Sequence, residues 1–290
     1  PGWADPIIIS TTPAADGAPL FVAKAEGFYK KHGIDVTPTL TVIMPTMPAA
    51  IISNSIQIGC ITTTTFVQAV AGGLDLVAIA GGSVISHGLI DTALVARTGS
   101  NIKGPKDLVG GPKVGVPGIG AYFDVIVSYW LMKHGVDPKQ VHFVEVPFPA
   151  MRDMLKSKTV DAVGAVDPVL SLIVKSKAGY PVGNIINDLP EGKSILVYAT
   201  TRQWATQHRK EVAAFQAAIA EADAFVTAHP KKAIADLGKF VKMPPPVLAL
   251  AKIGVQDPDI KPDQIGWWVG VMQQQGLLNG PVDTSKLVFK

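Results

Sequence analysis

The chain has 290 residues, of which 48% are hydrophobic and 17% are charged, and its formal net charge is +3. This length supports one large domain or two ordinary ones with sizeable cores, and the composition is unlike that of a disordered chain. Arginine and lysine are scattered rather than gathered on one stripe, so we expect no nucleic-acid partner.

A single cysteine and the lack of a long apolar stretch restrict the chemistry further. Cys60 alone excludes an intrachain disulfide and a multi-cysteine metal site, and in an apolar run it is expected to behave as a small hydrophobe. No apolar stretch reaches the roughly 18 residues that span a bilayer. Because the chain begins with Pro1 rather than Met, we expect a mature or truncated N-terminus that has lost a targeting segment.

The first part of the chain alternates short strands with helices. Strands are predicted at residues 6–11, 34–41, 56–61 and 74–82, and helices at 19–33, 49–55 and 62–73. Pro19 fits the first turn of the first helix, and Gly33 stands where its C-cap belongs. This alternation predicts an α/β fold rather than a helical bundle or a β-sandwich.

The same rhythm repeats in the second part, which ends in a helical tail. Strands are predicted at residues 91–98, 113–116, 141–147, 160–168 and 193–201, with helices at 118–135, 149–159, 211–230, 231–241, 244–253 and 263–278. We therefore predict two lobes. The first comprises residues 1–92 and 194–290, the second comprises 93–193, and the chain crosses between them near 90–96 and 186–198.

The turn between the strand at 113–116 and the following helix is the most informative segment. A helix N-terminus leaves backbone N–H groups unpaired and carries a partial positive charge, so it can bind an anion. Gly118 and Gly120 lack the side chains that would block such an anion. A plain glycine-rich turn is the structural alternative. The candidate ligand-binding residues here are Gly118, Ile119, Gly120, Ala121 and Tyr122.

Four other loops follow predicted strands, where open α/β sheets bind ligands. Each also has an ordinary structural explanation: capping for threonine, turn chemistry for aspartate, and simple exposure for histidine. The candidate ligand-binding residues in these loops are Asp16, Thr62, Thr63, Thr64, Ser83, His87 and Asp167.

Catalytic and cofactor motifs are missing from the sequence. The glycines fit neither the dinucleotide fingerprint G-x-G-x-x-G nor the P-loop, and there is no G-x-S-x-G or H-E-x-x-H segment. We therefore expect no catalytic residues, no cofactor and no metal site, and we expect that the protein is not an enzyme.

The order of several segments is characteristic of a known family. GAPLFVAKAEGFYKKHGIDV begins at Gly17, SNSIQIGC follows, a stretch from Asn101 to Pro147 includes DLVG and KV, and KTVDAVGAVDP ends at Pro168. From Ile7 to about Val241 the chain resembles the nitrate/sulfonate/taurine-type ABC-transporter solute-binding proteins.

The resemblance implies a type II periplasmic-binding-protein fold: two α/β lobes with a two-strand hinge and the ligand in the cleft between them. It also implies a periplasmic, monomeric protein that docks on an inner-membrane permease–ATPase complex. Carried onto this sequence, the cleft loops are those already named, together with Thr12.

The family pattern also bears on the ligand. Many relatives have an aromatic–acid–proline sequence where this chain has Val166-Asp167-Pro168, so Tyr122 or Phe123 would have to supply the aromatic wall. Because the loops contain no arginine, we expect backbone N–H groups and hydroxyls to bind a small organic anion, such as a sulfonate, carboxylate or aromatic acid. Two alternatives are an enzyme related to thiamine-pyrimidine synthases and the ligand-sensing domain of a regulator.

Overall fold

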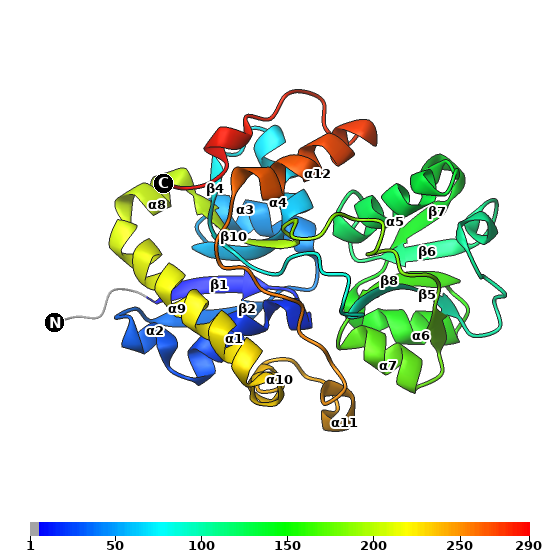
Figure 1. Ribbon diagram of the computed structural model, residues 1–290, viewed down its shortest axis with the longest axis horizontal. Coiled ribbons are helices and arrows are strands. Elements are labelled where there is room, and N and C mark those ends of the chain that lie inside the picture. The colour runs from blue at the N-terminus through cyan, green and yellow to red at the C-terminus, as the bar shows by residue number, and fades with distance from the viewer. Residues whose placement is uncertain (1–5) are drawn as a thin grey trace.

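Two five-stranded sheets form the centres of two α/β units in the computed structural model, which describes residues 6–290 (Figure 1). The first sheet has the order β2-β1-β3-β10-β4, and β10 runs antiparallel to both of its neighbours. Its strands are β1 (Ile7–Thr11), β2 (Val36–Leu40), β3 (Ile58–Thr62), β4 (Leu76–Gly81) and β10 (Leu196–Thr201). We call the part of the molecule built on this sheet the first unit.

The second sheet has the order β7-β6-β8-β5-β9, and β5 runs antiparallel to both of its neighbours. Its strands are β5 (Thr92–Arg97), β6 (Lys113–Val116), β7 (His142–Glu145), β8 (Ala162–Val166) and β9 (Gly179–Pro181). The part built on this sheet is the second unit. The chain enters it between β4 and β5 and leaves it between β9 and β10, while the lobe boundaries given above stay a prediction.

Helices cover the sheets, which explains why the inner strands are mostly apolar runs. Every residue of β4 and of β8 is buried. The helices of the first unit that precede β5 are α1 (Ala18–Ala25), α2 (Phe28–Lys31), α3 (Met47–Ile52) and α4 (Thr63–Ala71). Those of the second unit are α5 (Tyr122–Lys133), α6 (Met151–Lys156) and α7 (Val169–Lys175).

The predicted alternation of strands and helices is confirmed, with local differences. The single helix predicted at 19–33 is divided into α1 and α2, because Gly27 adopts a left-handed conformation with φ of +78°. Two elements, α7 and β9, were not predicted. They lie in residues 169–181, which follow a proline and contain only short apolar runs.

The helical tail covers the first unit and then contacts both units. Its helices are α8 (Arg202–Gln207), α9 (Arg209–Ala228), α10 (Pro230–Leu237), α11 (Pro245–Leu248) and α12 (Pro262–Gln274). The long helix α9 packs against α1 and α2, α11 packs against α7, and α12 packs against α4 and α5 (Figure 1). The tail therefore links the two units at two places.

Trp268 of α12 anchors the tail to the segment that returns to the first sheet. Its side chain is fully buried, and its indole Nε1–H donates a hydrogen bond of 2.6 Å to the carbonyl oxygen of Ser194. The ring also meets that of Tyr122 edge to face, with centroids 5.6 Å apart. The neighbouring Trp267 is only partly buried.

We expect Trp268→Phe to lower the free energy of unfolding by about 1–3 kcal/mol, because it leaves a buried carbonyl without its donor. Trp267→Phe is the matched control and should cost less, since it removes no hydrogen bond of the described structure. Urea unfolding of both variants tests this. Equal losses would show that the Trp268–Ser194 bond contributes nothing.

Candidate functional site

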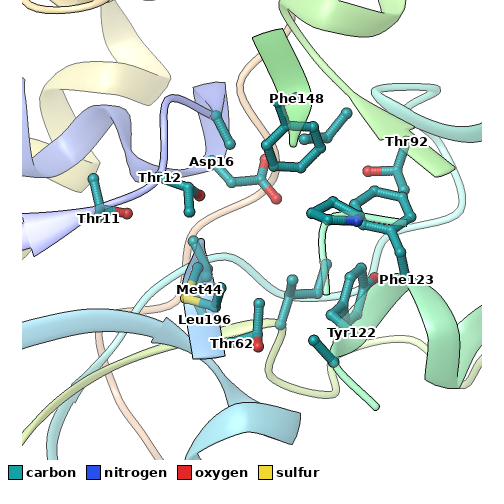
Figure 2. A pocket seen from close by; sticks show the side chains of 15 residues that line it. Thr11, Thr12, Asp16, Met44, Thr62, Thr92, Tyr122, Phe123, Phe148 and Leu196 are labelled. Atoms are coloured by element: carbon teal, nitrogen blue, oxygen red, sulfur yellow. The ribbon is translucent and has the colours of Figure 1, made fainter. Parts of the chain in front are cut away.

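A pocket with a cavity volume of about 50 Å³ lies between the two sheets (Figure 2). The first unit and the returning chain contribute Thr11, Thr12, Ala14, Asp16, Met44, Thr62, Ile195 and Leu196. The second unit contributes Thr92, Pro117, Ala121, Tyr122, Phe123, Phe148 and Val166. Both units thus supply a wall, as a site that closes around a small molecule requires.

The direction of the strands explains why these residues meet. The parallel strands β1, β3, β6 and β8 point their carboxyl ends at the pocket, where Thr11, Thr62, Pro117 and Val166 lie. The antiparallel strands β5 and β10 point their amino ends at the pocket, at Thr92 and Leu196. One edge of each sheet therefore faces the other.

Aromatic rings and other apolar groups dominate the lining, and a few hydroxyl groups stand among them. Phe123 meets Tyr122 and Phe148 edge to face, with ring centroids 5.5 and 5.9 Å apart, and Met44 lies on the opposite side in Figure 2. The hydroxyls come from Thr11, Thr12, Thr62, Thr92 and Tyr122. Such a lining suits a small organic body with a few polar groups.

Asp16 is the charged residue of the lining, and its carboxylate is almost completely buried. The Ser83 hydroxyl donates to Oδ2 at 3.1 Å, and the Gly254 N–H donates to Oδ1 at 3.2 Å. Burial raises the pKa of Asp16 to about 6, although these two hydrogen bonds act in the opposite direction. The carboxyl is therefore mostly ionised at neutral pH.

Two further carboxylates lie near Asp16. Burial, followed by the charge of Asp16, raises the pKa of Asp91 to about 8. Burial also raises the pKa of Asp167. That residue lies behind the pocket wall, where Oδ1 accepts from the N–H and hydroxyl of Ser171 and Oδ2 accepts from the Lys252 N–H at 2.8 Å.

Of the residues predicted from sequence, five line the pocket: Thr12, Asp16, Thr62, Ala121 and Tyr122. Ser83 stands behind Asp16 and holds it. Thr62 also caps α4, since its hydroxyl oxygen accepts from the Thr65 N–H. These placements agree with the expectation that loops after strands gather at one crevice.

Three other candidates do not line the pocket. Thr63 is fully buried and donates to the Ser194 hydroxyl at 3.0 Å, and Thr64 is fully buried beside Thr62. His87 hydrogen-bonds through Nε2 to the Leu189 carbonyl, at 2.7 Å. Their roles in the structure are packing and hydrogen bonding within the chain.

The anion seat at the start of α5 stays a prediction, and one of its amides differs from the expectation. The Gly120 N–H is not free, because it donates to Oδ2 of Asp124, one turn later, at 2.7 Å. Ile119 is 52% exposed and outside the pocket. At least one amide of the expected seat is therefore already bonded within the chain.

The two glycines instead permit the units to approach each other. A Cβ atom at Gly118 would lie 2.9 Å from Cγ of Pro45, and one at Gly120 would lie 3.0 Å from Nε2 of Gln68. Pro45 and Gln68 belong to the first unit. Gly120 also has a φ of +71°, which favours glycine.

Sequence analysis missed several lining residues for three reasons. Phe148 follows a predicted strand, so the strand-end rule could have found it. Thr92 and Leu196 lie at the beginnings of antiparallel strands, and the direction of a strand within its sheet leaves no signal in the sequence. Met44 lies in a loop that has no distinguishing motif.

The described residues offer little for metal or thiol chemistry. Among residues 6–290, no group of three or more His, Cys, Asp or Glu side chains could hold a metal ion. Cys60 is buried, and burial raises the pKa of its thiol to about 12, so a reactive thiolate does not form near neutral pH. Within the same range, none of the helices combines the length and hydropathy needed to cross a bilayer.

Comparison with known proteins identifies the family. Residues 14–233 match the family described as NMT1/THI5 like. The chain belongs to this family. It is 26% identical over 234 residues to the putative binding protein YtlA of Bacillus subtilis, covering 76% of this chain and 65% of YtlA. It is also 26% identical over 226 residues to a putative thiamine biosynthesis protein of Haemophilus influenzae, covering 75% and 67%.

Solved structures confirm the predicted periplasmic-binding-protein fold. The alkanesulfonate-binding protein SsuA of Xanthomonas axonopodis superposes with a TM-score of 0.82 at 18% identity, covering 100% of this chain and 99% of that one. The periplasmic nitrate-binding protein NrtA of Synechocystis superposes with a TM-score of 0.78 at 19% identity, covering 98% and 85%. At such identities the likeness shows the fold alone, but it matches the family resemblance found in the sequence.

The raised pKa of Asp91 predicts how stability depends on pH. The folded state holds this proton more tightly than the unfolded chain. Ionisation of Asp91 therefore lowers the free energy of unfolding as the pH rises from about 4 through 8. Asp91→Asn should therefore raise the melting temperature at pH 8.5 more than at pH 5.

The matched control is Asp153→Asn, which alters an exposed carboxyl whose pKa is lowered by its hydrogen bond to Arg152. That variant should gain nothing at alkaline pH. Melting curves of the ligand-free proteins across the pH range test both. A gain for Asp91→Asn that does not depend on pH would contradict the assignment.

Proposed function

We propose that this chain is the solute-binding component of a bacterial ABC importer. It captures a small organic solute between its two units in the periplasm and delivers it to a permease–ATPase complex. The observation that carries the proposal is the pocket itself, whose walls come from both units and consist mainly of aromatic and other apolar groups with a few hydroxyls. The family membership and the binding proteins among the relatives support it.

Solute entry requires the units to separate, and the contacts across the pocket are few enough to break. The Ala15 N–H donates to the Asp167 carbonyl oxygen at 2.8 Å, and Gly118 and Gly120 adjoin Pro45 and Gln68. Residues 82–91 and 182–195 join the sheets and are the natural hinge. We propose the lobe boundaries given above: residues 1–92 and 194–290 form the first lobe, and residues 93–193 form the second.

The enzyme alternative has one supporting observation, the name of the Haemophilus relative. The fifteen residues of the pocket lining include no histidine, lysine or cysteine, which leaves Asp16 and Tyr122 as the groups there that could transfer a proton. Passive binding is the function that these side chains support best.

A thermal-shift panel tests the proposed function. It should contain sulfonates, carboxylates, aromatic acids, amines and pyrimidines. We expect at least one class to raise the melting temperature, since a solute at 100 times its dissociation constant adds about 2.7 kcal/mol of stability. Turnover of a panel member without any stabilising solute would refute passive binding.

Closure can be tested at Gly118. We expect Gly118→Val to lower the affinity for any solute found in the panel at least tenfold, because its side chain would collide with Pro45 when the units meet. Gly111→Val is the control, as nothing lies within 4 Å of a Cβ atom there. Isothermal titration measures affinity, and small-angle X-ray scattering measures compaction. Undiminished affinity in the Gly118 variant would mean that closure is not needed for binding.

A further inference from the structure

The pocket contains a negative charge and no positive one. Asp16 is charged at neutral pH, and no Lys, Arg or His belongs to the lining in the described part of the chain. The four arginines contact other partners: Arg97 pairs with Asp161, Arg152 with Asp153, Arg202 with Asp75, and Arg209 lies over the Phe289 ring. An anionic ligand would therefore meet a carboxylate without a counter-ion.

Two further carboxyl groups lie close to Asp16. A Cβ atom at Gly254 would lie 2.6 Å from Oδ1 of Asp16 and 3.0 Å from Oδ2 of Asp91, so both carboxyls face the same glycine. The charge of Asp167 also raises the pKa of both carboxyls. The nearby cation is Lys252, whose exposed ammonium donates to the Ile90 carbonyl at 3.2 Å rather than to any of these carboxyls.

Asp16 retains the capacity to bind a donor. Each of its oxygens accepts one hydrogen bond from the protein, and an ionised carboxylate can accept about four in all. In Figure 2 the carboxylate points toward the space between Met44 and the aromatic rings. A ligand N–H group in that space would therefore meet free lone pairs.

Tyr122 provides an independent indication of a polar ligand. Its side chain is 5% exposed and lines the same pocket, across from Asp16 in Figure 2. Its hydroxyl oxygen is buried and has no hydrogen-bond partner among the described residues. Buried hydroxyls are rarely left unpaired, since the loss costs about 1–3 kcal/mol, so a bound molecule is the natural partner.

We propose that the ligand is a small organic cation, an amine or amidinium on an apolar body, whose N–H groups donate to Asp16. This inference rests on the proposed solute-binding function. The body packs against Tyr122, Phe123 and Phe148, whose ring faces also attract a positive charge. The ligand thereby neutralises the buried carboxylate that closure removes from water.

The test compares probes that share one body and differ in charge. Benzylamine and benzamidine are the cations, benzyl alcohol is neutral, and benzoate is the anion. A second set uses butylamine, butanol and butyrate. Isothermal titration at pH 7.5 should give at least tenfold tighter binding of each cation than of its matched anion.

Asp16→Asn separates charge from shape. We expect this variant to lose at least tenfold in affinity for the cations while binding benzyl alcohol within about twofold of the wild type. Asp153→Asn, on an exposed surface, should change neither. If Asp16→Asn does not fold, the order of the probes on the wild-type protein still decides the question.

The outcomes distinguish the two proposals. Tighter binding of the anions, equal binding of all charges, or unchanged cation affinity in Asp16→Asn would overturn the cation assignment and leave the solute-binding function standing. Failure of every solute, whether in these sets or in the wider panel, would overturn both.

Discussion

The arrangement of the cleft depends on one buried carboxylate. Asp16 belongs to the turn after β1, yet the donors that hold it come from Ser83, before the chain enters the second unit, and from Gly254, in the tail. Three segments far apart in sequence therefore meet at a single charged group. Burying that charge is unfavourable, and these hydrogen bonds offset only part of the cost, as the raised pKa of Asp16 indicates. A bound group that donates further hydrogen bonds to Asp16 would offset more of this cost.

The tail makes the same carboxylate sensitive to the relative position of the units. Two backbone N–H groups, two residues apart, donate to acids on opposite sides of the cleft: Lys252 to Asp167 and Gly254 to Asp16. On the other side of the molecule, α12 places Trp268 against Tyr122, and Gln275 donates to the Val125 carbonyl. Separation of the units must break some of these contacts or carry the tail with one unit. The tail therefore contacts both units and is more than a cover for the first sheet.

Sequence reasoning identified the fold and part of the site for the same physical reason. Apolar periodicity revealed alternating strands and helices, and parallel strands end at a common edge, so Thr12, Asp16 and Tyr122 could be placed in the pocket. Sequence reasoning did not find the residues whose place in the pocket depends on tertiary structure. The strand that begins at Thr92 is antiparallel, and the approach of Asp91 to Asp16 depends on how the two units meet. The expectation that the Gly120 amide is free did not hold, for a local reason: Asp124 stands four residues after Gly120 and accepts from its N–H, a spacing that was visible in the sequence.

The fold and the ligand follow from different parts of this chain. This chain shares its fold, with two sheets that face each other edge to edge, with structures named for sulfonate and nitrate binding. The fold itself does not determine the charge of the ligand. Charge is set by side chains in the loops, where this chain has Asp16 and Asp91 and no arginine. At neutral pH Asp91 keeps its proton, because burial, and after it the nearby charge of Asp16, raises its pKa to about 8. The ionised Asp16 would attract a bound cation and repel a bound anion. On the cation proposal, Asp16 would therefore disfavour anionic ligands such as those for which these structures are named.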